Sequence, residues 1–274
     1  MKRTAETDWA LPQAGPLAGS STTGQPMNGG TGGSQNFRIP AIITLQNGWL
    51  MAAADTRWGT GGDGGGLDTI VSISKDNGDT WEYSFPIYFP DSNGYAGNRA
   101  TTIIDPALIQ GSDETIYLIA DVNPTGVTTM GGFKMPGAGT GYINIDGVER
   151  LALTNNYSKV NISPTNSDIT SYPYYVGDVG ENGYSPVIDR ATSQPTEYVV
   201  DEWFNLFKVG EDDSILVLTQ KQVNTSQDIK QNVFYKGSDL HVYNTGYMWL
   251  LTSTDNGATW NMNDLNPQIK RNTE

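Results

Sequence analysis

Two apolar runs of strand length flank a turn signal early in the chain. The runs at 37–45 and 49–57 are rich in Ile, Ala, Leu and Met, and the Asn-Gly pair at 47–48 favours a two-residue hairpin turn. We therefore predict a β-hairpin. A two-residue loop continued without a bulge places Arg38 opposite Arg57, so that both side chains project from one face of the sheet.

Further short runs of the same character follow along the chain. The stretches 67–73, 101–109 and 115–120 are rich in β-branched and apolar residues and are bounded by polar turn residues. No long stretch has apolar residues at the spacing of a helix. The pattern predicts an all-β protein in which short strands are joined by tight turns.

Two arginines on one face of a sheet repel each other, and this repulsion requires a neutralising group. In one interpretation Asp55 or another nearby carboxylate neutralises Arg38 and Arg57, or the strand ends splay apart. In the other interpretation the arginine pair forms a site for a carboxylate ligand. The strand pattern leaves both interpretations open.

A segment of eight residues occurs twice. Residues 74–81 and 253–260 both read Ser-x-Asp-x-Gly-x-x-Trp, and each copy follows a strand-like run. The aspartate can accept hydrogen bonds from its own turn, the glycine can take a positive φ, and the tryptophan can anchor the turn on the core. Repeated units of this kind predict the blades of a propeller.

A glycine-rich loop separates the predicted hairpin from the next strand. Asp63 is the only charged residue of this loop at 59–66, and no helix follows, which argues against a phosphate-binding turn. The loop is either a flexible connector or a mobile segment that carries a carboxylate over a site. Farther along, Asp105 interrupts an apolar run and precedes Pro106, a combination that requires an edge strand or a bulge.

The composition divides the chain into four parts. Residues 1–34 are rich in Gly, Ser, Thr and Pro and predict a flexible tail or linker with little core of its own. Residues 35–122 hold the first predicted blades. Residues 123–245 lack the repeated turn and predict a small β-rich subdomain inserted into the propeller. Residues 246–274 return to the propeller with the second copy of the turn.

Charge and rare residues narrow the range of functions. The net charge of −14 argues against nucleic acid as a partner and requires local arginines for any anionic substrate. The chain has no cysteine and one histidine, so we expect no disulfide, no metal site and no cofactor, and we interpret His241 as an ordinary residue at a strand edge. No apolar run approaches the ~20 residues of a membrane span, and no signal peptide is visible.

Together these motifs resemble the bacterial sialidases. The stretch 37–40, Phe-Arg-Ile-Pro, matches the arginine motif of that family, and the repeated turns match its Asp-boxes. Arg57, Asp63 and Asp105 follow at matching distances. The resemblance implies a six-bladed β-propeller, present here in part. It also implies that Arg38 binds the carboxylate of sialic acid and that Asp63 is the general acid/base. Arg57 and Asp105 would line the sugar pocket.

The activity implied by the resemblance is the release of terminal sialic acid from glycoconjugates by a retaining mechanism, with a sialylated glycan as the partner. In this family a glutamate activates a tyrosine nucleophile. We find no match in this chain for these two residues or for the second and third arginines of the carboxylate clamp. A blade takes ~40–50 residues, so about three blades remain outside the tail and the insertion. The chain therefore resembles the N-terminal half of the catalytic domain, and the other half is a candidate partner.

Alternatives to a hydrolytic sialidase stay open. The inserted subdomain resembles that of the larger bacterial sialidases, including those that act as intramolecular trans-sialidases. The missing tyrosine and glutamate favour a non-catalytic fragment that binds sialylated glycans, whereas Asp63 argues against it because a pure lectin needs no general acid. A protein of this family is expected to be secreted or bound to the cell surface.

Overall fold

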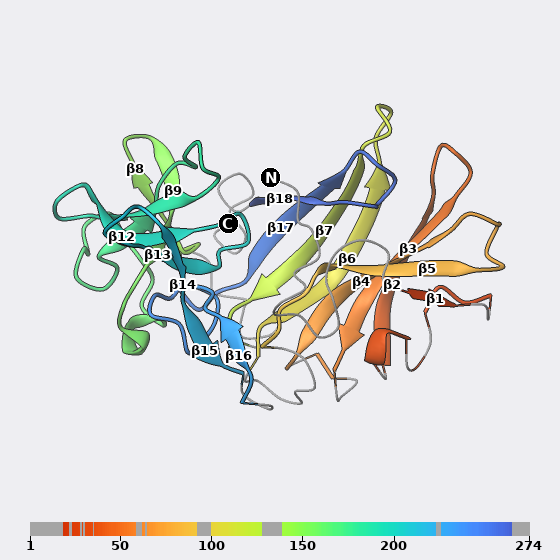
Figure 1. Ribbon diagram of the computed structural model, residues 1–274, viewed down its shortest axis with the longest axis horizontal. Coiled ribbons are helices and arrows are strands. Elements are labelled where there is room, and N and C mark those ends of the chain that lie inside the picture. The colour runs from red at the N-terminus through yellow and green to blue at the C-terminus, as the bar shows by residue number, and fades with distance from the viewer. Residues whose placement is uncertain are drawn as a thin grey trace. The chain divides into compact units, whose positions relative to one another are not determined.

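The computed structural model describes residues 19–21, 24–27, 29, 31–34, 36–58, 62–63, 65–91, 100–127, 139–222 and 226–264 (Figure 1). This part of the chain consists of strands, turns and two short 3-10 helices, Thr31–Gly33 and Tyr157–Lys159, so the predicted all-β class is confirmed. It forms two compact units. Unit 1 contains the described residues up to Val122 together with Met248–Asp264, and unit 2 contains those of Asn123–Tyr247.

The nine described strands of unit 1 form two sheets, of five and four strands, which a single parallel pairing connects. In the first sheet β2 to β5 follow one another as an antiparallel meander, and the short β1 is added on the outer edge of β5. In the second sheet the order is β6-β7-β17-β18, so β17 returns from far along the chain to lie beside β7 (Figure 1). One parallel pair, Leu67 with Thr102, joins the two sheets. The strand bounds are β1 Gly19–Ser21, β2 Asn36–Thr44, β3 Leu50–Arg57, β4 Leu67–Ser74, β5 Trp81–Ile87, β6 Thr102–Gln110, β7 Ile116–Asn123, β17 Tyr247–Ser253 and β18 Asn261–Asp264.

The two sheets are arranged like neighbouring blades of a partial propeller, and they do not close on themselves. The core of the first blade is an apolar and aromatic cluster of Ala54, Trp58, Ile70, Phe85 and Tyr88. The described residues form two blades, whereas the sequence predicts about three. The difference arises because β17 and β18 complete the sheet that β6 and β7 begin, and so do not start another.

Part of the segment predicted to be a tail belongs to the fold of unit 1. β1 pairs with β5 in that segment. Ser34 is fully buried, and its hydroxyl donates a hydrogen bond of 3.2 Å to the backbone oxygen of Arg57. A Cβ atom on Gly32 would lie 2.5 Å from Cζ of Phe85, so the close approach of this loop requires glycine. For these residues the prediction of a flexible tail is wrong, because small residues here permit close packing as well as flexibility.

The turn between β2 and β3 is one residue longer than predicted. Only Gly48 takes a positive φ, of 85°, whereas a two-residue turn of the favoured type needs two such residues. The amide of Leu45 donates to the backbone oxygen of Trp49 at 2.8 Å, and this bond closes a three-residue loop. The strand pairing that follows is therefore shifted by one residue.

A bulge in β2 shifts the pairing by one residue more. It lies at Ile39 and Pro40, and beyond it Arg38 lies opposite Asp55 and not opposite Arg57 as predicted. A shift of one residue turns a side chain to the other face of a sheet, and a second shift turns it back. Arg38 and Arg57 therefore still project from one face, although they are not directly paired.

The repeated turns have the predicted bonding. In the first copy both Oγ of Ser74 and the amide of Thr80 donate to Oδ1 of Asp76, each at 2.8 Å. Gly78 has a φ of 98°, and Trp81 is 3% exposed. The same hydrogen bonds, φ and buried tryptophan recur in the second copy, at Ser253, Asp255, Gly257, Thr259 and Trp260. The roles predicted for Asp, Gly and Trp are confirmed.

Unit 2 consists of a seven-stranded sheet whose strands lie in chain order and a separate pair, β15 and β16. Each strand of the larger sheet pairs antiparallel with the next. The bounds are β8 Tyr142–Ile145, β9 Val148–Leu153, β10 Tyr174–Val176, β11 Ser185–Asp189, β12 Gln194–Val200, β13 Leu206–Val209, β14 Ile215–Val217, β15 Thr219–Lys221 and β16 Asp228–Lys230.

Two sets of contacts stabilise the segments of unit 2 that lie outside its strands. The guanidinium of Arg190 donates hydrogen bonds of 2.8–3.1 Å to four backbone oxygens in the connection between β9 and β10, those of Thr165, Asn166, Asp168 and Tyr172. The two ends of the unit also meet. The amide of Thr125 donates to the backbone oxygen of Phe234 at 3.0 Å, and the ring of Phe234 packs against that of Tyr247 with centroids 5.0 Å apart.

Candidate functional site

Three charged side chains meet at the end of the first hairpin. Oδ1 of Asp63 accepts hydrogen bonds from Nη1 of Arg57 at 2.6 Å and from Nη1 of Arg38 at 3.1 Å. The strand ends supply the arginines, and the glycine-rich loop supplies the carboxylate. The side chains of Arg38 and Asp63 are 50% and 59% exposed, whereas that of Arg57 is fully buried. The site therefore has an open side, formed by Arg38 and Asp63, and a buried side.

The buried side is held by a carboxylate that the motif search did not select as a site residue. Oδ2 of Asp55 accepts a hydrogen bond of 2.6 Å from Nη2 of Arg57, and both side chains are fully buried. Oδ1 of Asp55 accepts a bond of 2.9 Å from the amide of Asp105 on β6. Burial raises the pKa of Asp55 to about 7, and the bonds from Arg57 and Asp105 act in the opposite direction.

Two residues of the site have left-handed backbone conformations. Ile39 has a φ of 54° and Asp105 a φ of 61°, and each precedes a proline in the innermost strand of its blade. A left-handed conformation costs an L-residue ~1–2 kcal/mol, and it is rare for a β-branched residue. A bulge interrupts β2 next to Arg38, and the left-handed residue of β6 is Asp105 itself, so backbone strain is present at two of the predicted site residues.

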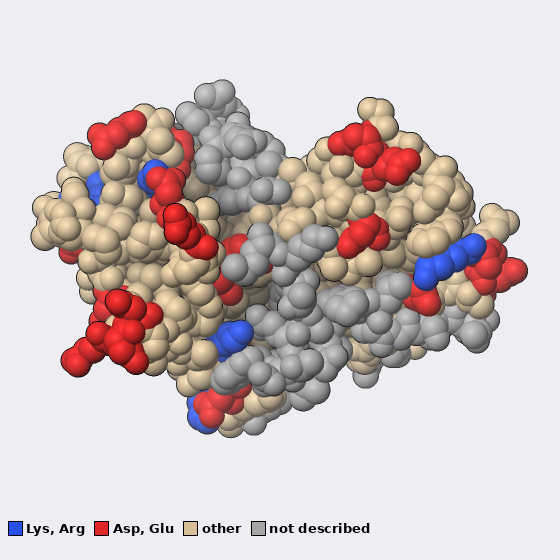
Figure 2. All heavy atoms as spheres, turned by 45° about the horizontal axis from the view of Figure 1, so that its top comes forward, with Lys and Arg blue, Asp and Glu red and all other residues tan. Residues whose placement is uncertain are grey.

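The two arginines lie close together in a protein that is acidic overall. On the face shown in Figure 2, acidic side chains are widespread and basic side chains are few, as the net charge of −14 implies. The hydrogen bond from Arg57, together with the charges of Arg57 and Arg38, holds the pKa of Asp63 below its ordinary value. Asp63 is therefore ionised at neutral pH while it contacts the arginines, and it occupies the position of an anion between them.

The structure brings the four predicted site residues into one network. Arg38, Arg57 and Asp63 touch directly, and Asp105 joins them through its backbone amide and Asp55. Of the two interpretations of the arginine pair, the neutralising one describes this structure, because the ionised Asp63 lies between the arginines and Asp55 accepts a hydrogen bond from Arg57. The spacing of Asp55 was a usable signal, because a residue two positions before Arg57 on a strand shares its face.

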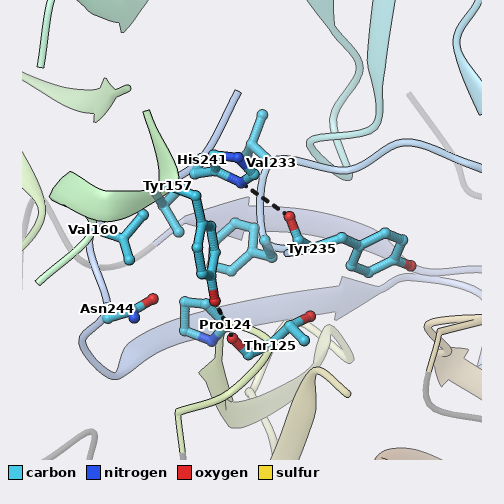
Figure 3. Close-up of a pocket in the computed structure, with 10 residues that line it drawn as sticks. Pro124, Thr125, Tyr157, Val160, Val233, Tyr235, His241 and Asn244 are labelled. Carbon is cyan, nitrogen blue, oxygen red and sulfur yellow. Dashed lines mark hydrogen bonds between the residues drawn. The ribbon is translucent and has the colours of Figure 1, made fainter. Parts of the chain in front are cut away.

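His241 lies in unit 2, away from these residues in sequence and buried. It forms a β-bridge with Thr154, and its Nδ1 lies 3.1 Å from the backbone oxygen of Tyr235. Its ring packs edge-on against Tyr157, whose hydroxyl donates to the backbone oxygen of Thr125 (Figure 3). These side chains line a hollow without room for a water molecule. A packing role for His241 explains these contacts.

Burial lowers the pKa of His241 below the usual value of 6.5. Because the folded state takes up a proton less readily than the unfolded state, the stability contributed by His241 is complete above pH 6.5. It declines as the pH falls below 6.5 towards the folded pKa. The chain has one histidine, so a single imidazole signal in an NMR titration reports this group. We expect a midpoint below 6.5, and a midpoint at or above 6.5 would contradict a buried packing role.

The described part of the chain lacks two further features. It contains no cluster of three or more His, Cys, Asp or Glu side chains able to hold a metal ion. No helix in it is long and apolar enough to cross a membrane.

Two blade-like sheets interrupted by a β-rich unit, with arginines and aspartates at the inner strands, place this chain in the class of sialidase-like folds. The intramolecular trans-sialidase of Ruminococcus gnavus superposes with a TM-score of 0.71 and is 26% identical, over 93% of this chain and 52% of that one. The fold class predicted from the sequence, a partial β-propeller of the sialidase type, is therefore confirmed.

The chain is similar in sequence to sialidases, which are glycoside hydrolases. The anhydrosialidase of Macrobdella decora is 27% identical over 263 residues, 86% of this chain and 32% of that protein. Sialidase B of Streptococcus pneumoniae serotype 4 is 28% identical over 260 residues, 84% of this chain and 34% of that protein. The chain thus spans about a third of these curated relatives. No protein-family model matches it.

Proposed function

We propose that this chain supplies one part of the active site of an exo-α-sialidase that releases terminal sialic acid from glycoconjugates with retention. The observation that carries the proposal is the position of Asp63 between Arg38 and Arg57. Guanidinium groups are suited to binding a carboxylate through paired hydrogen bonds. A sugar carboxylate can take the place of the Asp63 carboxylate at Arg38, which is half exposed.

This exchange would also prepare Asp63 for acid catalysis. A general acid must be protonated, yet the arginines hold the pKa of Asp63 low while it contacts them. When the substrate carboxylate binds Arg38 and Asp63 also leaves Arg57, whose hydrogen bond is the main cause of the low pKa, the pKa of Asp63 rises. The group can then donate a proton to the leaving glycosidic oxygen. Arg57 and Asp105 then line the sugar pocket. The nucleophilic tyrosine, its glutamate and two further arginines come from outside this chain.

A second candidate activity is intramolecular trans-sialylation. Two of the similar structures belong to intramolecular trans-sialidases, and that of the leech enzyme was solved with 2,7-anhydro-Neu5Ac. The leech enzyme superposes with a TM-score of 0.68 and is 27% identical to this chain. The residues around Arg38 and Asp63 do not discriminate between the two reactions. A non-catalytic fragment that binds sialylated glycans is the third candidate.

The inner strand of the first blade supports a partner that completes the propeller. β2 has the composition of a core strand, yet none of its side chains is buried, and Ile42 is 62% exposed. Within the described residues β2 pairs only with β3, and a hollow of about 310 Å³ lies beside it. We propose that further blades, in a longer chain or a second one, cover this surface. We also propose that the protein acts outside the cell, where sialylated glycans are exposed.

The test is cleavage of a fluorogenic sialoside by the purified chain, alone and mixed with the C-terminal half of a sialidase relative. Release only on mixing supports the proposal, and NMR of the product then separates free sialic acid from an anhydro sugar. Release by the chain alone would show that it contains its own nucleophile. Absence of release in a mixture that forms a complex would overturn the proposal and favour a glycan-binding fragment.

A further inference from the structure

Arg57 is held by two carboxylates of very different exposure. Its Nη1 donates to Asp63, which is 59% exposed and belongs to the glycine-rich loop, and its Nη2 donates to Asp55, which is fully buried on the same strand. A group that performs chemistry must leave its ground-state contacts. When Asp63 does so, Asp55 is the partner that keeps the Arg57 guanidinium in place.

The second oxygen of Asp55 fixes a different strand. It accepts the backbone amide of Asp105, which lies on β6 of the second blade and has a φ of 61°. Left-handed backbone is costly for aspartate and persists where the surroundings determine it. A charge-assisted bond from a buried carboxylate is a strong constraint of that kind. The exposed side chain of Asp105 thereby receives a defined direction.

From these contacts we propose that Asp55 is the positioning residue of the site, which fixes the Arg57 guanidinium with one oxygen and the Asp105 backbone with the other. The inference rests on the proposed function only in taking Arg57 and Asp105 as residues that line the sugar pocket. Asp55 does not touch the substrate. It acts through two residues on two blades, so it fixes the position of one relative to the other, and such support is needed to hold a site within ~0.5 Å.

The chain offers a matched control for this role. Asp68 is also a fully buried aspartate, and it also accepts one side-chain and one backbone donor, Nε1 of Trp58 and the amide of Phe89, both at 2.7 Å. Neither of these two hydrogen bonds involves one of the four proposed site residues. Asp55→Asn and Asp68→Asn therefore remove the same charge from similar surroundings, and they differ in the groups that lose their anchor.

The experiment follows the Arg57 guanidinium and the Asp105 amide by NMR in the 274-residue chain and its two variants. A titration with the unsaturated analogue of sialic acid runs in parallel. Asp55→Asn should shift or broaden both signals and weaken the analogue about 10–100-fold, the range typical for loss of a group that orients a ligand-binding residue. Asp68→Asn should lower Tm by a similar amount and leave both signals and the affinity unchanged.

Two results would overturn the proposal: unchanged Arg57 and Asp105 signals in Asp55→Asn, or an equal loss of affinity in the two variants. If Asp55→Asn does not fold, amide exchange in the wild-type chain decides, because the Asp105 amide should be protected although its residue is exposed. Exchange as fast as in exposed turns would overturn the proposal. If the wild-type chain does not bind the analogue, the proposed function is contradicted. The Arg57 and Asp105 signals would then still decide whether Asp55 positions these two residues.

Discussion

Replacing Arg57 with methionine should destabilise unit 1 by ~3–5 kcal/mol, the usual result of leaving one member of a buried ion pair without its partner. The carboxylate of Asp55 would remain fully buried and would lose its guanidinium at 2.6 Å. Urea unfolding monitored by tryptophan fluorescence measures the loss. Because its pKa is already raised by burial, Asp55 can take up a proton in the variant, and its pKa should rise further.

The loss of stability in Arg57→Met should also depend on pH, in a direction that follows from the raised pKa of Asp55. A carboxyl group whose folded pKa exceeds the unfolded value contributes stability that is complete below the unfolded pKa and is lost as pH rises towards the folded pKa. The folded pKa of Asp55 is already about 7 in the wild type, so both proteins lose this stability alike below pH 7. The deficit of Arg57→Met should therefore stay constant up to about pH 7 and grow above it, by up to ~1.4 kcal/mol for each pH unit. The double variant Asp55→Asn/Arg57→Met should recover most of the lost stability. A double variant that is no more stable than Arg57→Met would contradict the uncompensated-charge explanation.

Asp63→Asn should reduce kcat by about 10²–10⁴ in whatever assembly cleaves the sialoside, which is the usual contribution of a general acid/base. Asparagine keeps the shape of the side chain but cannot deliver the proton. It also no longer competes for Arg38 as an anion, so KM should stay the same or fall. Steady-state kinetics with the fluorogenic sialoside separate these two quantities.

The unfolding free energy of Asp63→Asn shows whether a loss of activity is due to chemistry or to unfolding. Asp63 is 59% exposed, and Asp55 remains as the buried partner of Arg57, so the unfolding free energy should change by only ~1 kcal/mol or less. Asp79→Asn, another exposed aspartate of unit 1, is the matched control and should keep the wild-type kcat. A rise in KM with an unchanged kcat would show that Asp63 binds substrate but does not transfer a proton.

Some of this site could be predicted from the sequence and some could not. The existence of the β2–β3 hairpin followed from its apolar runs and the Asn-Gly pair. Its register did not, because the choice between a two-residue and a three-residue loop depends on whether Asn47 takes a positive φ, and in the structure only Gly48 does. The bulge at Ile39 and Pro40 adds a second shift that no residue spacing reveals. Each shift turns the side chains of β2 to the other face, so the two together leave Arg38 on the face that was predicted. The prediction that the arginines share a face is therefore correct, although the direct pairing from which it was derived does not occur.

The role of Asp55 escaped the motifs for a different reason. It lies in an apolar run near two arginines, so the sequence suggested only that it neutralises their charge. Its second partner is a backbone amide on β6, and a bond to the backbone cannot be recognised from residue types. The opposite holds for the repeated turns. The hydrogen bonds of the serine, aspartate and threonine in each turn lie within eight residues, so the local sequence was enough to predict them.

The return of β17 to the side of β7 imposes an order on folding during synthesis. The strand emerges only after all of unit 2, roughly 6–25 s after β7 at ~5–20 residues per second. During that interval β7 presents an unpaired edge, which favours association with other chains. Unit 2 pairs its strands in chain order, so its contacts are local and should form quickly. When unit 2 folds, contacts among Thr125, Phe234 and Tyr247 bring its two ends together. β7 and β17 directly adjoin these ends, so β17 can pair with β7 soon after it is synthesised, and the edge of β7 is exposed for less time.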